Sequence, residues 1–221
     1  MNIARDASRI DIISDVICPW CYIGKRQLER ALPIVAADGI HLSVQWHAFQ
    51  LNPDMPAAGA DRATYRAQKF GSPQRAHELD EKITAAAAAV GLSFRTDLMQ
   101  RTPNTIQAHR LIWLAETQSK QDAVVEALFD VYFTKGADIG DHDTLMELGT
   151  NAGLTDTETF LNSDQGRREV TEFDALARRS GINGVPSFTM ANHVLFSGAV
   201  PAQTMAKALT QAHHILSSQA A

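Results

Sequence analysis

Two cysteines separated by a proline and a tryptophan constrain this chain more than any other feature. Cys18 and Cys21 are the only cysteines among its 221 residues. They cannot complete a structural zinc site, which takes four nitrogen or sulfur ligands, because no second cysteine pair or His-x-His lies nearby. A structural disulfide across so short a loop would remove little chain entropy. We therefore interpret the pair as redox-active, against the alternative of two unrelated buried cysteines.

The residues on either side of the pair predict a strand that leads into a helix. Residues 10–17 are rich in isoleucine and valine, which is typical of a buried strand. After the pair, Leu28 and Leu32 have a helical spacing, and Pro19 suits the first turn of a helix. Pro33 should kink this helix or end it after Leu32.

This arrangement predicts different roles for the two sulfurs. At a helix N-terminus, free backbone amides and the positive end of the helix dipole favour a thiolate, so we expect Cys18 to be the accessible, attacking sulfur. Cys21 would lie on the same face one turn later, about 5 Å away between Cα atoms, which is within reach of a disulfide. We expect Cys21 to be shielded and to resolve the mixed disulfides that Cys18 forms.

The rest of the chain predicts an α/β fold in three segments. Residues 40–48 alternate apolar and polar side chains, so residues 1–53 read as a strand–helix–strand half with parallel strands. Strand patterns then give way to helical ones, and we assign residues 54–180 to a helical insertion. Residues 181–221 read as a hairpin, turning at Ala191-Asn192-His193, followed by a closing helix.

Charge and hydropathy exclude several classes of partner. The formal net charge is -5 and the isoelectric point about 5.9, so no positive field attracts nucleic acid. No apolar stretch approaches the roughly 20 residues of a membrane span. The first residues, Met1–Asp11, mix charges and lack the apolar region of a secretory signal, so we expect a cytoplasmic protein.

A cluster of polar residues in the predicted helical segment could form a metal site. Asp138, Asp141, His142 and Asp143 supply carboxylates and an imidazole within six residues. An apolar helical face begins just afterwards, at Leu145, so helix capping explains these residues more simply. We expect no metal site.

Several segments together carry a resemblance to a known family. They are 15–24, 46–53, Asn104 with 108–111, 128–129 with 132–133 and Gly136, 181–188, and 197–199. In these segments the chain resembles the DsbA-type branch of the thioredoxin superfamily, and most closely the cytoplasmic FrnE-like dithiol-disulfide oxidoreductases. The match runs almost end to end. It implies a thioredoxin fold with a large all-helical insertion.

The resemblance also implies a set of site residues. Val185–Pro186 should be a cis peptide that faces the cysteines, with the Val185 backbone pairing with a bound substrate chain. The implied catalytic residues are Cys18, Cys21 and Pro186, and the implied substrate-binding residues are Pro19, Trp20, Phe49, Asn52 and Val185. We expect Trp20 to be exposed, whereas Trp46 and Phe49 either frame an apolar groove or pack in the core. The implied partners are protein thiols and disulfides or glutathione. Glutathione would be a co-substrate and no cofactor is expected; a homodimer is compatible with the sequence.

Two alternatives to a dithiol oxidoreductase stay open. The related kappa-class glutathione transferases and 2-hydroxychromene-2-carboxylate isomerases share the architecture but carry serine in place of Cys18. A glutathione-dependent isomerase or transferase of a small aromatic substrate is therefore one alternative, and a redox-sensing binding module is the other. The cysteine pair favours dithiol exchange, because a serine cannot form a disulfide. Oxidase, reductase and isomerase directions are all open, and a reducing cytosol favours the last two.

Overall fold

The computed structural model describes residues 6–220, which form two compact units. The first unit combines the segment that ends at Phe49 with the segment that begins at Phe173, and the second is Gln50–Glu172. The sequence placed these borders at residues 53 and 180. The second border falls inside helix α8 (Arg167–Arg179), where no loop or change of composition marks it. Residues 1–5 of the charged start lie outside the described residues.

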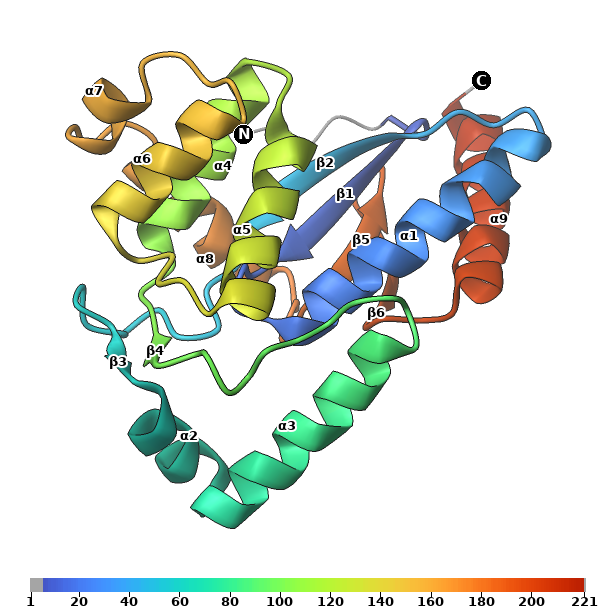
Figure 1. Cartoon of the computed structure of the whole chain (residues 1–221). Helices are drawn as coiled ribbons and strands as arrows, with labels where there is room; N and C mark the ends of the chain where they lie inside the picture. The colour runs from blue at the N-terminus through green and yellow to red at the C-terminus, as the bar shows by residue number, and fades with distance from the viewer. Residues whose placement is uncertain (1–5, 221) are drawn as a thin grey trace. The chain divides into compact units, whose positions relative to one another are not determined.

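Four strands form the sheet of the first unit (Figure 1): β1 (Arg9–Ser14), β2 (Ser43–Ala48), β5 (Ser187–Met190) and β6 (His193–Ser197). Their order in the sheet is β2-β1-β5-β6. β1 runs parallel to β2, whereas β5 is antiparallel to both β1 and β6. The predicted strand–helix–strand half and hairpin half are confirmed, and together they form the mixed sheet of a thioredoxin fold.

The register of the sheet gathers the core of this unit around β1. Ile12 pairs with Trp46 on β2 and with Phe188 on β5. All three side chains are buried. β1 is a central strand and its isoleucines are buried, as the isoleucine-rich sequence predicts.

Helix α1 (Pro19–Ala37) connects β1 to β2 and packs against α9 (Ala202–Ala220) (Figure 1). Of the two effects expected of Pro33, a kink or an end, the end is wrong, because the helix continues to Ala37. Pro33 is exposed, where water can replace the hydrogen bond that proline cannot donate. The fully buried Val35 packs the turn beyond it.

The hairpin between β5 and β6 turns within two residues. Ala191 and Asn192 both have positive φ, 47° and 69°, as a tight two-residue hairpin turn requires. The sequence assigned three residues to this turn, but His193 already belongs to β6.

The second unit is mainly helical. It contains α2 (Arg62–Phe70), α3 (Pro73–Ala88), α4 (Ile106–Thr117), α5 (Gln121–Lys135), α6 (His142–Asn151), α7 (Thr157–Leu161) and the start of α8. The expected all-helical insertion also contains a small antiparallel pair, β3 (Ala60–Asp61) with β4 (Arg101–Thr102). Strands of two residues are too short to show an alternating pattern. Within residues 6–220, none of the helices combines the length and hydropathy that crossing a membrane requires.

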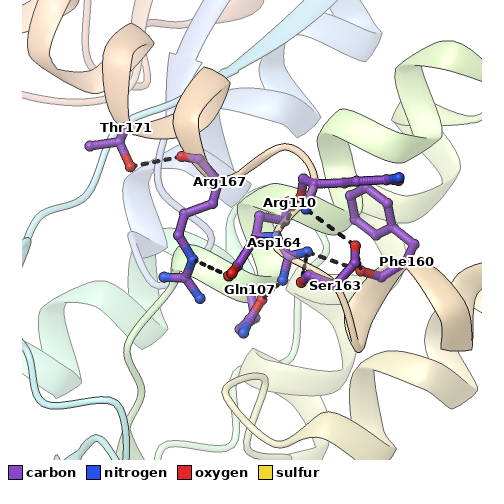
Figure 2. A network of polar contacts seen from close by, with 8 residues as sticks. Gln107, Arg110, Phe160, Ser163, Asp164, Arg167 and Thr171 are labelled. Carbon is purple, nitrogen blue, oxygen red and sulfur yellow. Dashed lines mark hydrogen bonds and ion pairs between the residues drawn. The ribbon is translucent and has the colours of Figure 1, made fainter.

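A buried arginine organises the segment between α7 and α8 (Figure 2). Arg110 in α4 is fully buried and donates hydrogen bonds to three backbone carbonyl oxygens, those of Phe160 (3.0 Å), Ser163 (2.6 Å) and Gln165 (2.7 Å). Its guanidinium also lies 5.0 Å from the centroid of the Phe160 ring. One cation thus satisfies several carbonyls of an irregular segment.

Candidate active site

The cysteine pair lies where β1 leads into α1. Cys18 is the N-cap residue of α1, with an extended backbone (φ -87°, ψ 113°), and Pro19 occupies the first turn. The Cys18 amide donates to the Asp15 carbonyl, and the Cys21 amide donates to the Cys18 carbonyl, both at 3.0 Å. The predicted position of Cys18 at a helix N-terminus is confirmed.

The chain of the hairpin half reaches the pair through Val185 and Pro186. The peptide bond between them is cis. The Cys18 thiol donates to the Val185 carbonyl oxygen, with 3.5 Å between Sγ and oxygen. Pro186 is buried against α1 at Gly24, where a Cβ would lie only 3.1 Å from the Pro186 Cγ. Gly24 therefore lets the proline segment approach the helix that carries the cysteines.

Both cysteines are buried. Cys18 is 4% exposed and Cys21 is 0% exposed. The expectation of an accessible Cys18 is wrong for this structure, where the Val185 carbonyl lies against its sulfur. Trp20, between the cysteines, is 43% exposed, as expected. A substrate that reacts with Cys18 has to replace the contact between the sulfur and Val185.

Cys21 is held as a neutral thiol. Burial raises the pKa of the Cys21 thiol well above its ordinary value, and the hydrogen bond and charge of Cys18 raise it further. The Ser14 hydroxyl and the Asp15 backbone amide act in the opposite direction and lower this pKa. Burial is the largest effect, so Cys21 keeps its proton near neutral pH. This protonation state suits a thiol that stays unreactive until a mixed disulfide forms beside it.

Comparison with known proteins agrees with this geometry. Residues 9–210 match the family described as the DSBA-like thioredoxin domain. The chain belongs to this family. It is 32% identical to a probable DsbA oxidoreductase, SCO1869 from Streptomyces coelicolor, whose crystal structure superposes with a TM-score of 0.83 over 92% of this chain and 89% of that one.

Two more distant structures share the DSBA-like fold. The cytosolic disulfide reductase DsbM from Pseudomonas aeruginosa, also solved with glutathione (GSH), is 17% identical with a TM-score of 0.63. A 2-hydroxychromene-2-carboxylate isomerase is 13% identical with a TM-score of 0.66. Both superpositions cover 96% of this chain and 98% of the other. The family and the Streptomyces relative support thiol-disulfide oxidoreductase chemistry in general, whereas these two structures show the fold alone.

Three of the five residues expected to bind substrate lie at the pair: Pro19, Trp20 and Val185. Phe49 is instead packed in the first unit. It is 2% exposed, and the Arg178 guanidinium lies 4.1 Å from the centroid of its ring. Of the two interpretations of Phe49, core packing is the one these contacts favour.

Asn52, the fifth expected substrate-binding residue, belongs to the second unit. Its side-chain oxygen accepts a hydrogen bond from the Lys69 ammonium at 3.0 Å and another from the Tyr65 hydroxyl, both on α2. These bonds give Asn52 a structural role in its own unit. Substrate binding by Asn52 stays a prediction.

Asp141 caps a helix, as the simpler interpretation expects. The Asp141 carboxylate accepts hydrogen bonds from the Thr144 amide at 2.9 Å and the Thr144 hydroxyl at 3.0 Å, at the N-terminus of α6. Asp138 accepts from the Gly140 amide at 2.9 Å and pairs with Arg101 at 3.3 Å. Residues 6–220 contain no group of three or more His, Cys, Asp or Glu side chains arranged to hold a metal ion.

Two buried polar residues of β1 were not identified as candidates from the sequence. Asp11 is fully buried, and its carboxylate lies 2.7 Å from His47 Nε2 and 3.1 Å from an Arg9 nitrogen. Ser14 is buried beside Cys21. The available signal was the same for both: a polar residue beside the isoleucines of a strand that reads as buried.

Proposed function

We propose that the protein is a dithiol-disulfide oxidoreductase that cycles Cys18 and Cys21 through mixed disulfides. The observation that carries this proposal is the pairing of Cys18, at the N-terminus of α1 and against the Val185 carbonyl, with a protonated Cys21 one turn later. The N-terminus of the helix favours a thiolate on Cys18, and burial keeps Cys21 protonated until the second step.

In the reducing direction, the Cys18 thiolate attacks a substrate disulfide, and one substrate sulfur leaves as a thiolate. Cys21 then loses its proton to that thiolate or to water and attacks the Cys18 sulfur. The bond between Cys18 and the substrate breaks, the Cys18–Cys21 disulfide forms, and the second substrate sulfur leaves as a thiolate. Two electrons pass from the protein to the substrate. The oxidising direction is the reverse of these steps.

The proposed substrates are protein disulfides and glutathione. The Val185 backbone lies next to the reactive sulfur, where it can pair with an extended peptide, and the exposed Trp20 ring offers an apolar contact. The disulfide reductase DsbM, solved with glutathione, supports glutathione as a co-substrate. We propose action in the cytoplasm in the reducing or isomerising direction, since a reducing environment keeps thiols reduced.

The isomerase alternative has weaker support. The isomerase of similar fold is 13% identical, which shows the fold alone. By the resemblance, isomerases of this kind carry serine in place of Cys18, and a serine cannot take part in a mixed disulfide. The isomerase would become the favoured function if Cys21→Ser, with glutathione, converts 2-hydroxychromene-2-carboxylate faster than it exchanges disulfides.

Trapping experiments test the proposed function. Cys21→Ser should accumulate mixed disulfides between Cys18 and a disulfide-containing protein, because the resolving thiol is gone. Cys18→Ser should form none, and it serves as the matched control. Mass spectrometry of acid-quenched mixtures measures both. Equal exchange by wild type and the two variants would exclude the dithiol mechanism.

A further inference from the structure

One buried hydroxyl beside the cysteine pair has no part in the steps above. Ser14 is the last residue of β1 and is 5% exposed. Its hydroxyl makes no hydrogen bond of ordinary geometry to any other described residue. Buried hydroxyls nearly always have such a partner, because leaving one unsatisfied costs stability. The position of this hydroxyl therefore calls for a functional explanation.

The group that the Ser14 hydroxyl faces is the Cys21 sulfur, and the contact lowers the pKa of that thiol. A neutral thiol is a weak hydrogen-bond partner. A thiolate is a strong acceptor. A hydroxyl can rotate, so the same oxygen can accept weakly from the thiol and donate strongly to the thiolate.

The strand fixes the Ser14 hydroxyl in place. Ser14 pairs with Ala48 on β2, and its carbonyl accepts a hydrogen bond from the Phe49 amide at 2.9 Å. Cys21 is fully buried, so bulk water does not reach its sulfur to stabilise a negative charge. The groups that can do so are supplied by the end of β1: the Ser14 hydroxyl and the Asp15 amide.

We propose that Ser14 is a positioning residue for the resolving step: its hydroxyl donates a hydrogen bond to the Cys21 thiolate as that thiolate attacks the mixed disulfide. This inference rests on the proposed function, because it concerns the second step of the dithiol reaction. Ser14 itself loses no proton. The proton of Cys21 goes to the substrate thiolate released in the first step or to water, and the bonds made and broken are those given above.

Two sets of variants isolate the hydroxyl. Ser14→Ala removes it. Ser14→Thr and Ser14→Val form a matched pair, since both side chains are β-branched, suit a strand and have nearly the same shape, while only threonine keeps the hydroxyl. Thr189→Val is a control for the loss of a buried hydroxyl elsewhere in the sheet. Its hydroxyl is bonded to the Asp11 carbonyl at 3.3 Å, away from the cysteines.

Reduced protein is mixed with oxidised glutathione and quenched with acid, and the products are identified by mass spectrometry, which separates the two steps. The mixed disulfide with glutathione reports the first step, and the intramolecular disulfide reports the second. Ser14→Ala and Ser14→Val should resolve the mixed disulfide about tenfold more slowly, because a hydrogen bond to a charged group is lost. Their resolving rates should also reach half-maximum at higher pH. Ser14→Thr and Thr189→Val should resolve at close to the wild-type rate.

The first step provides the internal control. The rate of glutathione adduct formation is measured in proteins that carry Cys21→Ser. This rate should be the same with and without the additional Ser14→Ala substitution. Resolution by Ser14→Val as fast as by Ser14→Thr, with the same pH profile, would overturn the inference while leaving the proposed function intact. If the wild type forms neither the adduct nor the intramolecular disulfide, the proposed function fails, and this inference fails with it.

Discussion

Gly24 controls how closely the Val185–Pro186 segment approaches the cysteines, and enlarging its side chain should separate them. A Cβ at this position would lie 3.1 Å from the Pro186 Cγ and 3.6 Å from the Phe188 ring. Carbon atoms in ordinary contact are about 3.5–4.0 Å apart, so Gly24→Ala should move Pro186 by about 0.4 Å or more. Gly24→Val adds two methyl groups and should move it by about an ångström.

These shifts should affect exchange more than stability. Alanine is favoured over glycine within a helix by about 1 kcal/mol, which offsets part of an overpacking cost of about 1–3 kcal/mol. The net change in the free energy of unfolding for Gly24→Ala should therefore stay within about 2 kcal/mol. A reacting group displaced by about 1 Å can lose 100-fold in rate. We expect exchange to fall roughly threefold in Gly24→Ala and at least tenfold in Gly24→Val.

The assay is the rate at which Cys18 forms a mixed disulfide with oxidised glutathione, compared with the free energy of unfolding in urea. Arg30→Val is the control, because it adds a valine to the exposed face of the same helix. Wild-type exchange by Gly24→Val would refute the view that the packing of Pro186 on α1 positions the reactive sulfur.

Three further predictions concern the thiols and the buried arginine. Iodoacetamide should alkylate Cys18 before Cys21 near neutral pH, because Cys21 keeps its proton, and faster labelling of Cys21 would refute the assigned roles. The reduced protein should lose stability as the pH rises above about 8.5, since the unfolded chain releases the Cys21 proton first. Urea unfolding at increasing pH measures this loss, which should shrink in Cys21→Ala. Arg110→Met should lower the free energy of unfolding by about 3 kcal/mol, because three carbonyls lose a charged donor. Arg167→Met, at an exposed ion pair, should change it by less than about 0.5 kcal/mol, and equal thermal shifts in the two variants would contradict this account.

Features governed by local sequence were predictable. The apolar strand before Cys18 and Pro19 after it place the first cysteine at a helix N-terminus, because strand and helix signals act over a few residues. The parallel pairing of β1 with β2 follows from the helix between them. The family resemblance supplied the part that Val185 and Pro186 play in the site, which periodicity alone would not have revealed.

Features that depend on distant contacts were not predictable. The burial of Cys18 involves Val185, 167 residues further along the chain. Asp11 is buried with His47 of β2 as its partner, and that histidine comes within reach only when β1 and β2 pair in the sheet. The helix also continues through Pro33, since packing of the residues around it outweighs one missing hydrogen bond.

The redox equilibrium between Cys18 and Cys21 tests the proposed chemistry most directly. The protein would be equilibrated in buffers of varied ratio of reduced to oxidised glutathione, quenched with acid, and its disulfides identified by mass spectrometry. We expect a single reversible transition between the dithiol and one intramolecular disulfide, with glutathione adducts only as a minor species, and no such transition in Cys21→Ser. Free thiols at every ratio, or adducts that never give way to an intramolecular disulfide, would contradict a dithiol-disulfide oxidoreductase.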